Sequence, residues 1–494
     1  MIRIILIWTI LLSPLLAISQ EKYYGEAAGE KLDWAMYYLN EYYVDSVNTQ
    51  AITDAALRAI AAELDPYSVY QSAEELRKQR QNDDGTQFIG IGVTLISVDF
   101  LPRVTSIIKG SAAEVSELKK GDIIREVNGI SMHQKPINEV LDLLQGNPDT
   151  AVDLVIQRRQ QTFTKQLLRA RVPLISVETS FMLTKSTGYI KVIKFTQKTV
   201  EEFKSAYNSL AAAGMESLVL DLRGNNGGVF TAATGLSSLF LDEGNLISFT
   251  DGVISEREDH ICAHRGDYAD GKLVLLTDGV TASSSEVFSG SMQDWDRALV
   301  VGAPTFGKGL IQQSYGFGDS SAIRLTISKY YRPTGRAVQN PGNAALVFPS
   351  SISVGSETRQ HMSAGYTAST MSGREIYSLG AGVAPDVYYP TEWYDGTSVP
   401  YKYIAEYFFN NQSELIRTHY NLHGLLASST VDSYIKQNEP TIDDRDLAEV
   451  KAWLAALILG KDAYYETIST HDSVIKEAIK RIEDGTFDRL GVRY

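Results

Sequence analysis

The chain has 494 residues, 44% hydrophobic and 21% charged, with a formal net charge of −14. This length exceeds one hydrophobic core, so we expect about two to four domains. The acidic balance argues against a nucleic-acid partner, which needs a basic surface, and against anionic membrane surfaces. Cys262 is the single cysteine, so no internal disulfide is possible.

The N-terminal residues have the features of a secretory signal. An apolar run from Ile4 to Ile18 is broken by Pro14, and Ala17 and Ser19 supply the small residues of a cleavage site. The run is shorter than the roughly 20 residues of a spanning helix. We therefore expect residues 1–19 to be a signal peptide and the protein to be exported, to the periplasm or the extracellular space. An uncleaved membrane anchor is the alternative.

The next two segments differ in the spacing of their apolar residues. Apolar residues at helical spacing predict a helical segment over residues 20–86, interrupted by the proline turn LDPYS at Leu64–Ser68. Short apolar runs and glycines follow, so residues 87–172 are expected to form a compact strand-rich domain with two helices.

The second half of the chain changes pattern twice. Strand-like and helix-like runs alternate over residues 173–395, which predicts an α/β domain. A polar stretch at about residues 340–373 is expected to be a surface insertion in this domain. Residues 396–494 return to helical spacing, with aspartates before the runs and glycines after them.

Three serines precede Glu286 in TASSSEVF, Thr281–Phe288, at the start of a predicted helix. Ser283 and Glu286 match the capping box, in which the two side chains satisfy backbone donors. A helix N-terminus also stabilises an oxyanion through its unpaired N–H groups and its dipole. Capping and nucleophilic catalysis therefore both remain open, and the local pattern does not choose among the serines.

A base for such a serine must come from elsewhere, because no histidine lies between Thr281 and Gly309. A helix of about 18 Å, followed by an antiparallel return along a strand of about 20 Å, would bring Lys308 back to the serines. Lysine is a base only when neutral, so burial must lower its pKa by roughly three units. Gln312 can orient the amine, whereas a solvated loop lysine is the alternative.

A glycine-rich turn follows the predicted buried strand in SLVLDLRGNNGG, Ser217–Gly228. Gly227 and Gly228 allow close approach of a ligand to exposed backbone N–H groups. A nucleotide-binding phosphate loop needs a lysine after its last glycine, but Val229 stands there. The turn therefore predicts an oxyanion site, and no nucleotide cofactor.

These motifs together resemble the C-terminal processing peptidases, also called tail-specific proteases. The resemblance rests on DLRGNNGG, TASSSEVFSGSMQD, VVGAPTFGKGLIQ and GVAPDV, with YYVDSV, LDPYS and GIGV as the lead-in. It implies an α/β protease core with an inserted PDZ-like β-rich domain and helical N- and C-terminal segments. Motifs in the family order reach from the lead-in to about Val387.

The family spacing assigns roles residue by residue. The nucleophile stands three residues before the glutamate and 25 before the lysine, which selects Ser283. The resemblance then implies Lys308 as base and Gln312 as its orienting residue, with backbone N–H groups of Gly228 and Ser284 as oxyanion donors. Supporting positions fall on Gly227, Glu286, Asp294 and Thr305. Ser284 departs from the family, which usually has alanine there.

Residues 87–172 resemble a PDZ domain, with Gly90, Ile91, Gly92 and Val93 at its carboxylate-binding loop. A PDZ groove takes an extended peptide as an added strand and binds its terminal carboxylate through loop N–H groups. The expected partners are therefore polypeptides with free apolar C-termini. An adaptor protein and the oligomeric state stay open. A tight turn in a purely structural PDZ domain is the alternative reading of this loop.

We expect an exported serine endopeptidase with a Ser–Lys pair that cleaves proteins recognised through their C-terminal tails and needs no cofactor. A non-hydrolytic PDZ scaffold and a ligand-binding protein on the same fold are the alternatives. His260 and His264 flank Cys262, but no third ligand stands at metal spacing, so a metal site is not expected.

Overall fold

The computed structural model describes residues 26–82, 87–98, 100–158, 160–253, 256–340, 366–390, 429–438 and 440–494. The predicted signal at residues 1–19, most of the predicted insertion and residues 396–428 lie outside these ranges. Within them, no helix combines the length and the apolar character needed to cross a bilayer.

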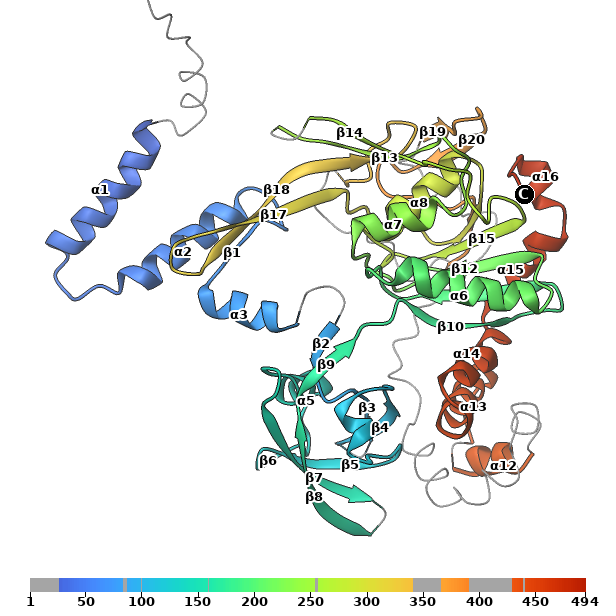
Figure 1. Cartoon of the computed structure of the whole chain (residues 1–494), viewed down its shortest axis with the longest axis horizontal. Coiled ribbons are helices and arrows are strands. Elements are labelled where there is room, and N and C mark those ends of the chain that lie inside the picture. The colour runs from blue at the N-terminus through green and yellow to red at the C-terminus, as the bar shows by residue number, and fades with distance from the viewer. Residues whose placement is uncertain are drawn as a thin grey trace, which may run out of the picture.

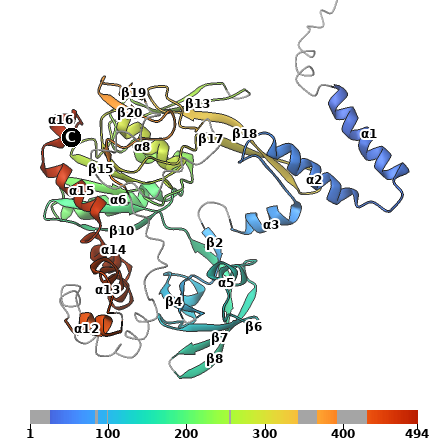
Figure 2. The ribbon, with the colours of Figure 1, turned by 180° about the vertical axis from the view of Figure 1, so that it is seen from behind.

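The N-terminal segment is helical, with one short strand. Its elements are α1 (Glu26–Tyr42), α2 (Thr49–Ala62), β1 (Val69–Gln71) and α3 (Ala73–Asn82). α1 stands clear of the rest of the molecule in both views (Figures 1 and 2). In the LDPYS turn, one Asp65 carboxylate oxygen accepts from the N–H groups of Tyr67 and Ser68, both at 2.8 Å. This turn leads directly into β1.

The β-rich domain follows and has its own hydrophobic core. Its elements are β2 (Gln87–Gly90), β3 (Val93–Val98), β4 (Leu101–Ile107), α4 (Ala112–Val115), β5 (Ile123–Val127), β6 (Ile130–Ser131), α5 (Ile137–Leu144), β7 (Ala151–Arg158), β8 (Gln161–Leu168) and β9 (Ala170–Pro173). The main sheet has the order β3-β4-β5-β7-β8, with β6 on β5. The first and last strands of the domain, β2 and β9, pair antiparallel, so the chain enters and leaves the domain at the same place. The domain lies below the core domain in Figure 1.

The core domain is built on a sheet of order β10-β11-β12-β15-β16-β21, in which β11 to β21 run parallel. Its strands are β10 (Val177–Met182), β11 (Thr187–Val192), β12 (Ser217–Asp221), β15 (Lys272–Thr277), β16 (Leu299–Gly302) and β21 (Val387–Tyr388). The helices α6 (Thr199–Ala212), α7 (Phe230–Ser237) and α8 (Ser284–Asp294) cover one face.

The last two helices of the chain, α15 (Ser473–Glu483) and α16 (Thr486–Leu490), cover the other face. Along β12, Leu218 and Leu220 pack toward α6 and α7, whereas Val219 packs toward α15. Side chains alternate between the faces of a strand, so strands that are buried on both sides become continuous apolar runs. The remaining tail helices are α12 (Ser429–Asn438), α13 (Asp444–Leu459) and α14 (Lys461–Ser469).

A second sheet joins the N-terminal segment to the core domain. It has the order β1-β18-β13-β14, with β17 on β18, and a separate hairpin pairs β19 with β20. The strands are β13 (Leu246–Asp251), β14 (Glu258–Ile261), β17 (Leu310–Gly316), β18 (Ala322–Tyr331), β19 (Tyr366–Ser369) and β20 (Glu375–Ser378). The predicted fold class, an α/β core with an inserted β-rich domain and helical ends, is confirmed.

Candidate active site

Ser283 is the N-cap of α8 and has an unusual backbone, with φ 56° and ψ −118°. Positive φ is rare for residues with a side chain and costs about 1–3 kcal/mol. Its N–H donates to Glu286 Oε2 at 2.8 Å, which helps to hold this conformation. Strained residues of this kind gather at functional sites.

The three serines differ in what their hydroxyls contact. Ser284 Oγ donates to the carbonyl of Gly228 at 2.9 Å, and Ser285 Oγ donates to the carbonyl of Asn225 at 3.0 Å. Both hydroxyl protons are therefore used in hydrogen bonds to the glycine-rich turn. The Ser283 hydroxyl instead lies beside the hydroxyl of Tyr330. This difference favours Ser283 as the reactive hydroxyl.

Gly227 and Gly228 lie where no larger residue would fit. A Cβ on Gly227, at φ 97°, would lie 2.7 Å from the Cβ of Ser283. A Cβ on Gly228, at φ 144°, would lie 2.0 Å from the carbonyl oxygen of Phe195. Asn225 fixes the turn, because its Oδ1 accepts from the Gly227 N–H and its carbonyl accepts from Ala282 N–H.

The two predicted oxyanion donors come together at this point. Within the described residues, no protein acceptor takes the N–H of Gly228 or that of Ser284. Two unengaged donors beside a serine side chain are what a developing oxyanion requires. The turn and the start of α8 thus supply one donor each.

Glu286 joins the start of α8 to the loop that carries Lys308. Its fully buried carboxylate accepts from Ser283 N–H at 2.8 Å, Thr305 Oγ1 at 2.6 Å, Gly307 N–H at 2.6 Å and Lys308 N–H at 2.9 Å. Burial raises its pKa to about 7, although these hydrogen bonds act in the opposite direction. Glu286 therefore caps α8 and also connects the start of this helix to the loop that carries Lys308.

The loop that carries Lys308 lies beside the start of α8, since the N–H of Phe306 donates to the carbonyl of Thr281 at 2.9 Å. Burial lowers the Lys308 pKa, and repulsion by Arg324 adds to this effect, while Glu286 opposes it. A lowered pKa is what a lysine base requires. Among the described residues, no hydrogen bond or ion pair engages the Lys308 ammonium.

Tyr67 contacts both predicted polar residues on this side. The Lys308 Nζ lies over its ring, 4.9 Å from the centroid. The Gln312 Nε2 donates to its carbonyl at 2.5 Å. Gln312 and Lys308 therefore both contact Tyr67. Among the described residues, no hydrogen bond joins Gln312 to Lys308, and none joins Lys308 to Ser283. Catalytic hydrogen bonds are often long in a free enzyme and tighten with substrate.

Two further residues of this region, Tyr67 and Tyr330, are not among the predicted site residues. The buried Tyr330 hydroxyl donates to the carbonyl of Lys308, and burial raises its pKa well above the usual value. Tyr67 arrives because β1 pairs with β18. The LDPYS motif was the available signal for Tyr67, whereas nothing local marks Tyr330.

Asp294 lies at the opposite end of α8 from Ser283. The helix spans Ser284–Asp294, about 15 Å at 1.5 Å per residue. The Asp294 carboxylate pairs with Arg332 and Arg336 and accepts from Thr334 Oγ1 at 2.7 Å. It therefore fastens the chain after β18 to the end of α8.

The predicted carboxylate loop runs between β2 and β3. The carbonyls of Ile91 and Gly92 accept from the N–H groups of Ala113 and Ile108, at 2.8 and 2.9 Å. Gly90 ends β2, while the side chains of Ile91 and Val93 belong to the domain core. The loop is thus held by the segment around α4.

The two histidines that flank Cys262 lie in a structural setting. The His260 ring lies 4.8 Å from that of Phe230, and the buried Cys262 thiol donates to the His264 carbonyl at 2.9 Å. In the described part of the chain, no three His, Cys, Asp or Glu residues gather in a metal-binding arrangement.

Comparisons with known proteins match two regions. Residues 186–344 match the model of peptidase family S41, and residues 103–158 match that of the PDZ domain. A probable CtpA-like serine protease of Staphylococcus epidermidis is 32% identical over 63% of this chain and 64% of its own length. The corresponding Staphylococcus haemolyticus protein is 31% identical over 63% of each. The chain thus spans slightly less than two thirds of these relatives.

A photosystem II D1 C-terminal processing protease, a solved structure, is 25% identical over 73% of this chain and 86% of that chain, with a TM-score of 0.42.

Proposed function

We propose that the chain is a serine endopeptidase with Ser283 and Lys308 as its catalytic pair. The match of residues 186–344 to the model of peptidase family S41, and of residues 103–158 to that of the PDZ domain, supports this proposal. The observation that carries the proposal is the strained conformation of Ser283, at φ 56°, beside the unengaged N–H groups of Gly228 and Ser284. A purely structural helix cap has no need of positive φ, since capping residues adopt extended conformations.

In the proposed reaction, Ser283 Oγ attacks the scissile carbonyl carbon while Lys308 takes the hydroxyl proton. The carbonyl oxygen becomes an oxyanion and accepts hydrogen bonds from the N–H groups of Gly228 and Ser284. Lys308 then gives the proton to the leaving amine, and an acyl-enzyme remains for water to hydrolyse. One such oxyanion donor typically contributes about 2.7–4 kcal/mol to the barrier reduction.

Lys308 must leave the face of Tyr67 to reach Ser283. Its flexible stem allows this movement, while Glu286 keeps its backbone in place through the 2.9 Å hydrogen bond to Lys308 N–H. The ring face favours the charged ammonium, whereas burial favours the neutral amine. Tyr67 is thereby proposed to hold the amine near Ser283 until substrate binds, and Gln312 to hold Tyr67 in place through its carbonyl.

The PDZ domain is proposed to select substrates by their free C-terminal tails. A peptide would add to the domain as a strand, and loop residues Gly90 to Val93 would donate N–H groups to its carboxylate. Charge-assisted hydrogen bonds of this kind are stronger than neutral ones. Apolar terminal side chains would be preferred because they can be desolvated in the groove.

Export is the proposed cellular setting, on the basis of the sequence of residues 1–19. An adaptor protein that delivers substrates is a further proposed partner. The alternative function is a non-hydrolytic scaffold or ligand-binding protein on the same fold. That alternative leaves the strained serine and the two open donors without a use.

The deciding experiment is casein hydrolysis by the purified protein and by its Ser283→Ala, Lys308→Ala and Ser284→Ala variants. The first two variants should be inactive with unchanged thermal melts, while Ser284→Ala keeps substantial activity. A wild-type protein without activity would support the scaffold alternative. An inactive Ser284→Ala together with an active Ser283→Ala would transfer the nucleophile role to Ser284.

A further inference from the structure

The glycine-rich turn that carries a proposed oxyanion donor is joined to the C-terminal helices by one arginine. Arg223 stands five residues before Gly228, and its Nη2 contacts two carboxylates. The first belongs to Asp221, at 2.7 Å, and the second to Asp472, at 2.8 Å. Asp221 ends β12 within the same motif, whereas Asp472 is the N-cap of α15, near the end of the chain.

Asp472 balances the charge around this arginine. The Nζ of Lys191 lies 3.4 Å from Asp221 Oδ2 and donates to the Arg223 carbonyl at 3.2 Å. Without Asp472, the two cations and Asp221 would carry a net charge of 2 − 1 = +1. None of the four side chains is more than 19% exposed, so solvent screens them weakly. Burial works against the charged form of Arg223, but the carboxylates of Asp221 and Asp472 outweigh it and hold its pKa well above the usual value.

The other side of the glycine-rich turn is fastened to the segment before α8. The N–H of Gly224 donates to Asp278 Oδ2 at 2.9 Å, and the carbonyl of Leu222 accepts from Thr281 Oγ1 at 3.1 Å. These hydrogen bonds tie the turn to the chain that leads into Ser283. The turn is therefore held between two parts of the chain, the segment before α8 and the start of α15.

We propose that Asp472 is a positioning residue for the oxyanion site: its carboxylate holds Arg223 and, through it, the turn that presents the Gly228 N–H. The inference rests on the proposed peptidase function and extends its machinery to the C-terminal helices. An oxyanion donor must lie within about 2.7–3.1 Å of the developing charge, so a small shift of this turn should slow the reaction.

The two oxygens of the Asp472 carboxylate make different contacts. Oδ1 accepts from the N–H groups of Val474 and Ile475, at 2.9 and 3.1 Å, and thereby caps α15. Oδ2 pairs with Arg223. Capping needs one oxygen and no charge, since asparagine and serine cap as well as aspartate does. The charge and the second oxygen therefore serve the contact with Arg223.

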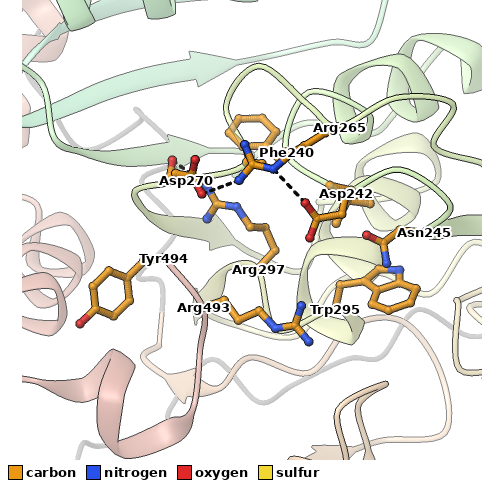
Figure 3. Close-up of a pocket in the computed structure, with 11 residues that line it drawn as sticks. Phe240, Asp242, Asn245, Arg265, Asp270, Trp295, Arg297, Arg493 and Tyr494 are labelled. Carbon is orange, nitrogen blue, oxygen red and sulfur yellow. Dashed lines mark hydrogen bonds and ion pairs between the residues drawn. The ribbon is translucent and has the colours of Figure 1, made fainter.

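The C-terminal helices have further attachments that do not involve Asp472. Apolar side chains of α15 and α16 pack against the sheet. The last two residues, Arg493 and Tyr494, line a small cavity with Trp295 at the end of α8 (Figure 3). There the N–H of Arg493 donates to the carbonyl of Asp296 at 2.7 Å. Removing only the charge of Asp472 should therefore loosen the turn while α15 and α16 stay on the sheet.

The test compares Asp472→Asn with the wild-type full chain by hydrogen exchange and by kinetics. Asparagine keeps the cap of α15 but removes the charge that faces Arg223. The N–H groups of Gly224 and Gly227, each hydrogen-bonded at 2.9 Å, report on the turn and should exchange faster in the variant. On an unstructured peptide, kcat should fall about tenfold or more with KM unchanged, because the oxyanion donors act in the transition state.

Asp443→Asn is the matched control. Asp443 caps α13 in the same way, accepting from the N–H of Asp446 at 2.7 Å, and among the described residues Arg223 pairs only with Asp221 and Asp472. This variant should exchange and turn over like wild type. If Asp472→Asn loses helix content, Asp472→Ser provides the same test, because serine also caps.

Unchanged exchange of the turn in Asp472→Asn would overturn the assignment, and so would faster exchange with an unchanged kcat. An equal loss of kcat in Asp443→Asn would overturn it too, because any altered helix cap would then have the same effect. A wild-type protein without peptidase activity would contradict the proposed function instead. The exchange measurement needs no turnover, so it tests the hold of Asp472 on the turn in either case.

Discussion

Replacing Gly227 with alanine should disable the proposed oxyanion site while leaving the fold largely intact. The new Cβ would lie 2.7 Å from the Cβ of Ser283 and 2.8 Å from the carbonyl oxygen of Ala282. Neither contact is with a flexible side-chain end, so the turn must move by several tenths of an ångström. Such a displacement draws the Gly228 N–H away from the oxyanion, and loss of one donor lowers kcat about 100- to 1,000-fold.

Gly224→Ala is the control in the same turn. Gly224 also has positive φ, 76° against 97° for Gly227, but an added Cβ would meet nothing within 4 Å. Both variants should therefore lose about 1–2 kcal/mol of stability from backbone strain. Only Gly227→Ala should lose activity as well.

The assay is kcat and KM on an unstructured peptide, alongside thermal melts of both variants. An equal loss of kcat in Gly224→Ala and Gly227→Ala would refute the reasoning, because strain alone would then explain the effect. A fully active Gly227→Ala would refute it too, since the contact with Ser283 would have no catalytic consequence.

Three further predictions concern the base, the buried glutamate and the substrate tail. Tyr67→Ala should expose Lys308 to water, which raises the Lys308 pKa and shifts the rise of kcat/KM to higher pH. Tyr67→Phe is the control and should keep the wild-type pH profile. A uniform loss of kcat/KM at every pH would indicate a merely structural role. Glu286 has a folded-state pKa of about 7, above its usual 4.5, so its stabilising contribution is fully present below about pH 4.5 and is lost as the pH rises through 7. The loss in the free energy of unfolding is roughly 3 kcal/mol. In urea unfolding at several pH values, Glu286→Gln should remove this fall in stability between about pH 4.5 and 7. An unchanged pH dependence of stability would contradict the assignment. Amidating the C-terminus of an unstructured substrate with an apolar tail should slow its cleavage at least several-fold, because the carboxylate charge is lost; equal rates would leave the PDZ domain with a structural role.

Several features of the site could be predicted from local sequence alone. A capping pattern at Ser283 marks a helix start whatever the surrounding fold, since its hydrogen bonds run between residues three apart. The length of α8 and the strand after it sets where Lys308 can return. Glycines before Val229 indicate close backbone approach, because only glycine adopts such conformations without strain.

Other features depend on contacts between distant parts of the chain, which no local periodicity encodes. Tyr67 reaches Lys308 only because β1 pairs with β18, more than 250 residues later in the chain. Tyr330 meets the Ser283 hydroxyl only after β18 has folded against the core domain. Local patterns determined which residues could carry the chemistry, whereas tertiary packing decided which groups surround them, because desolvation and long-range pairing exist only in the folded chain.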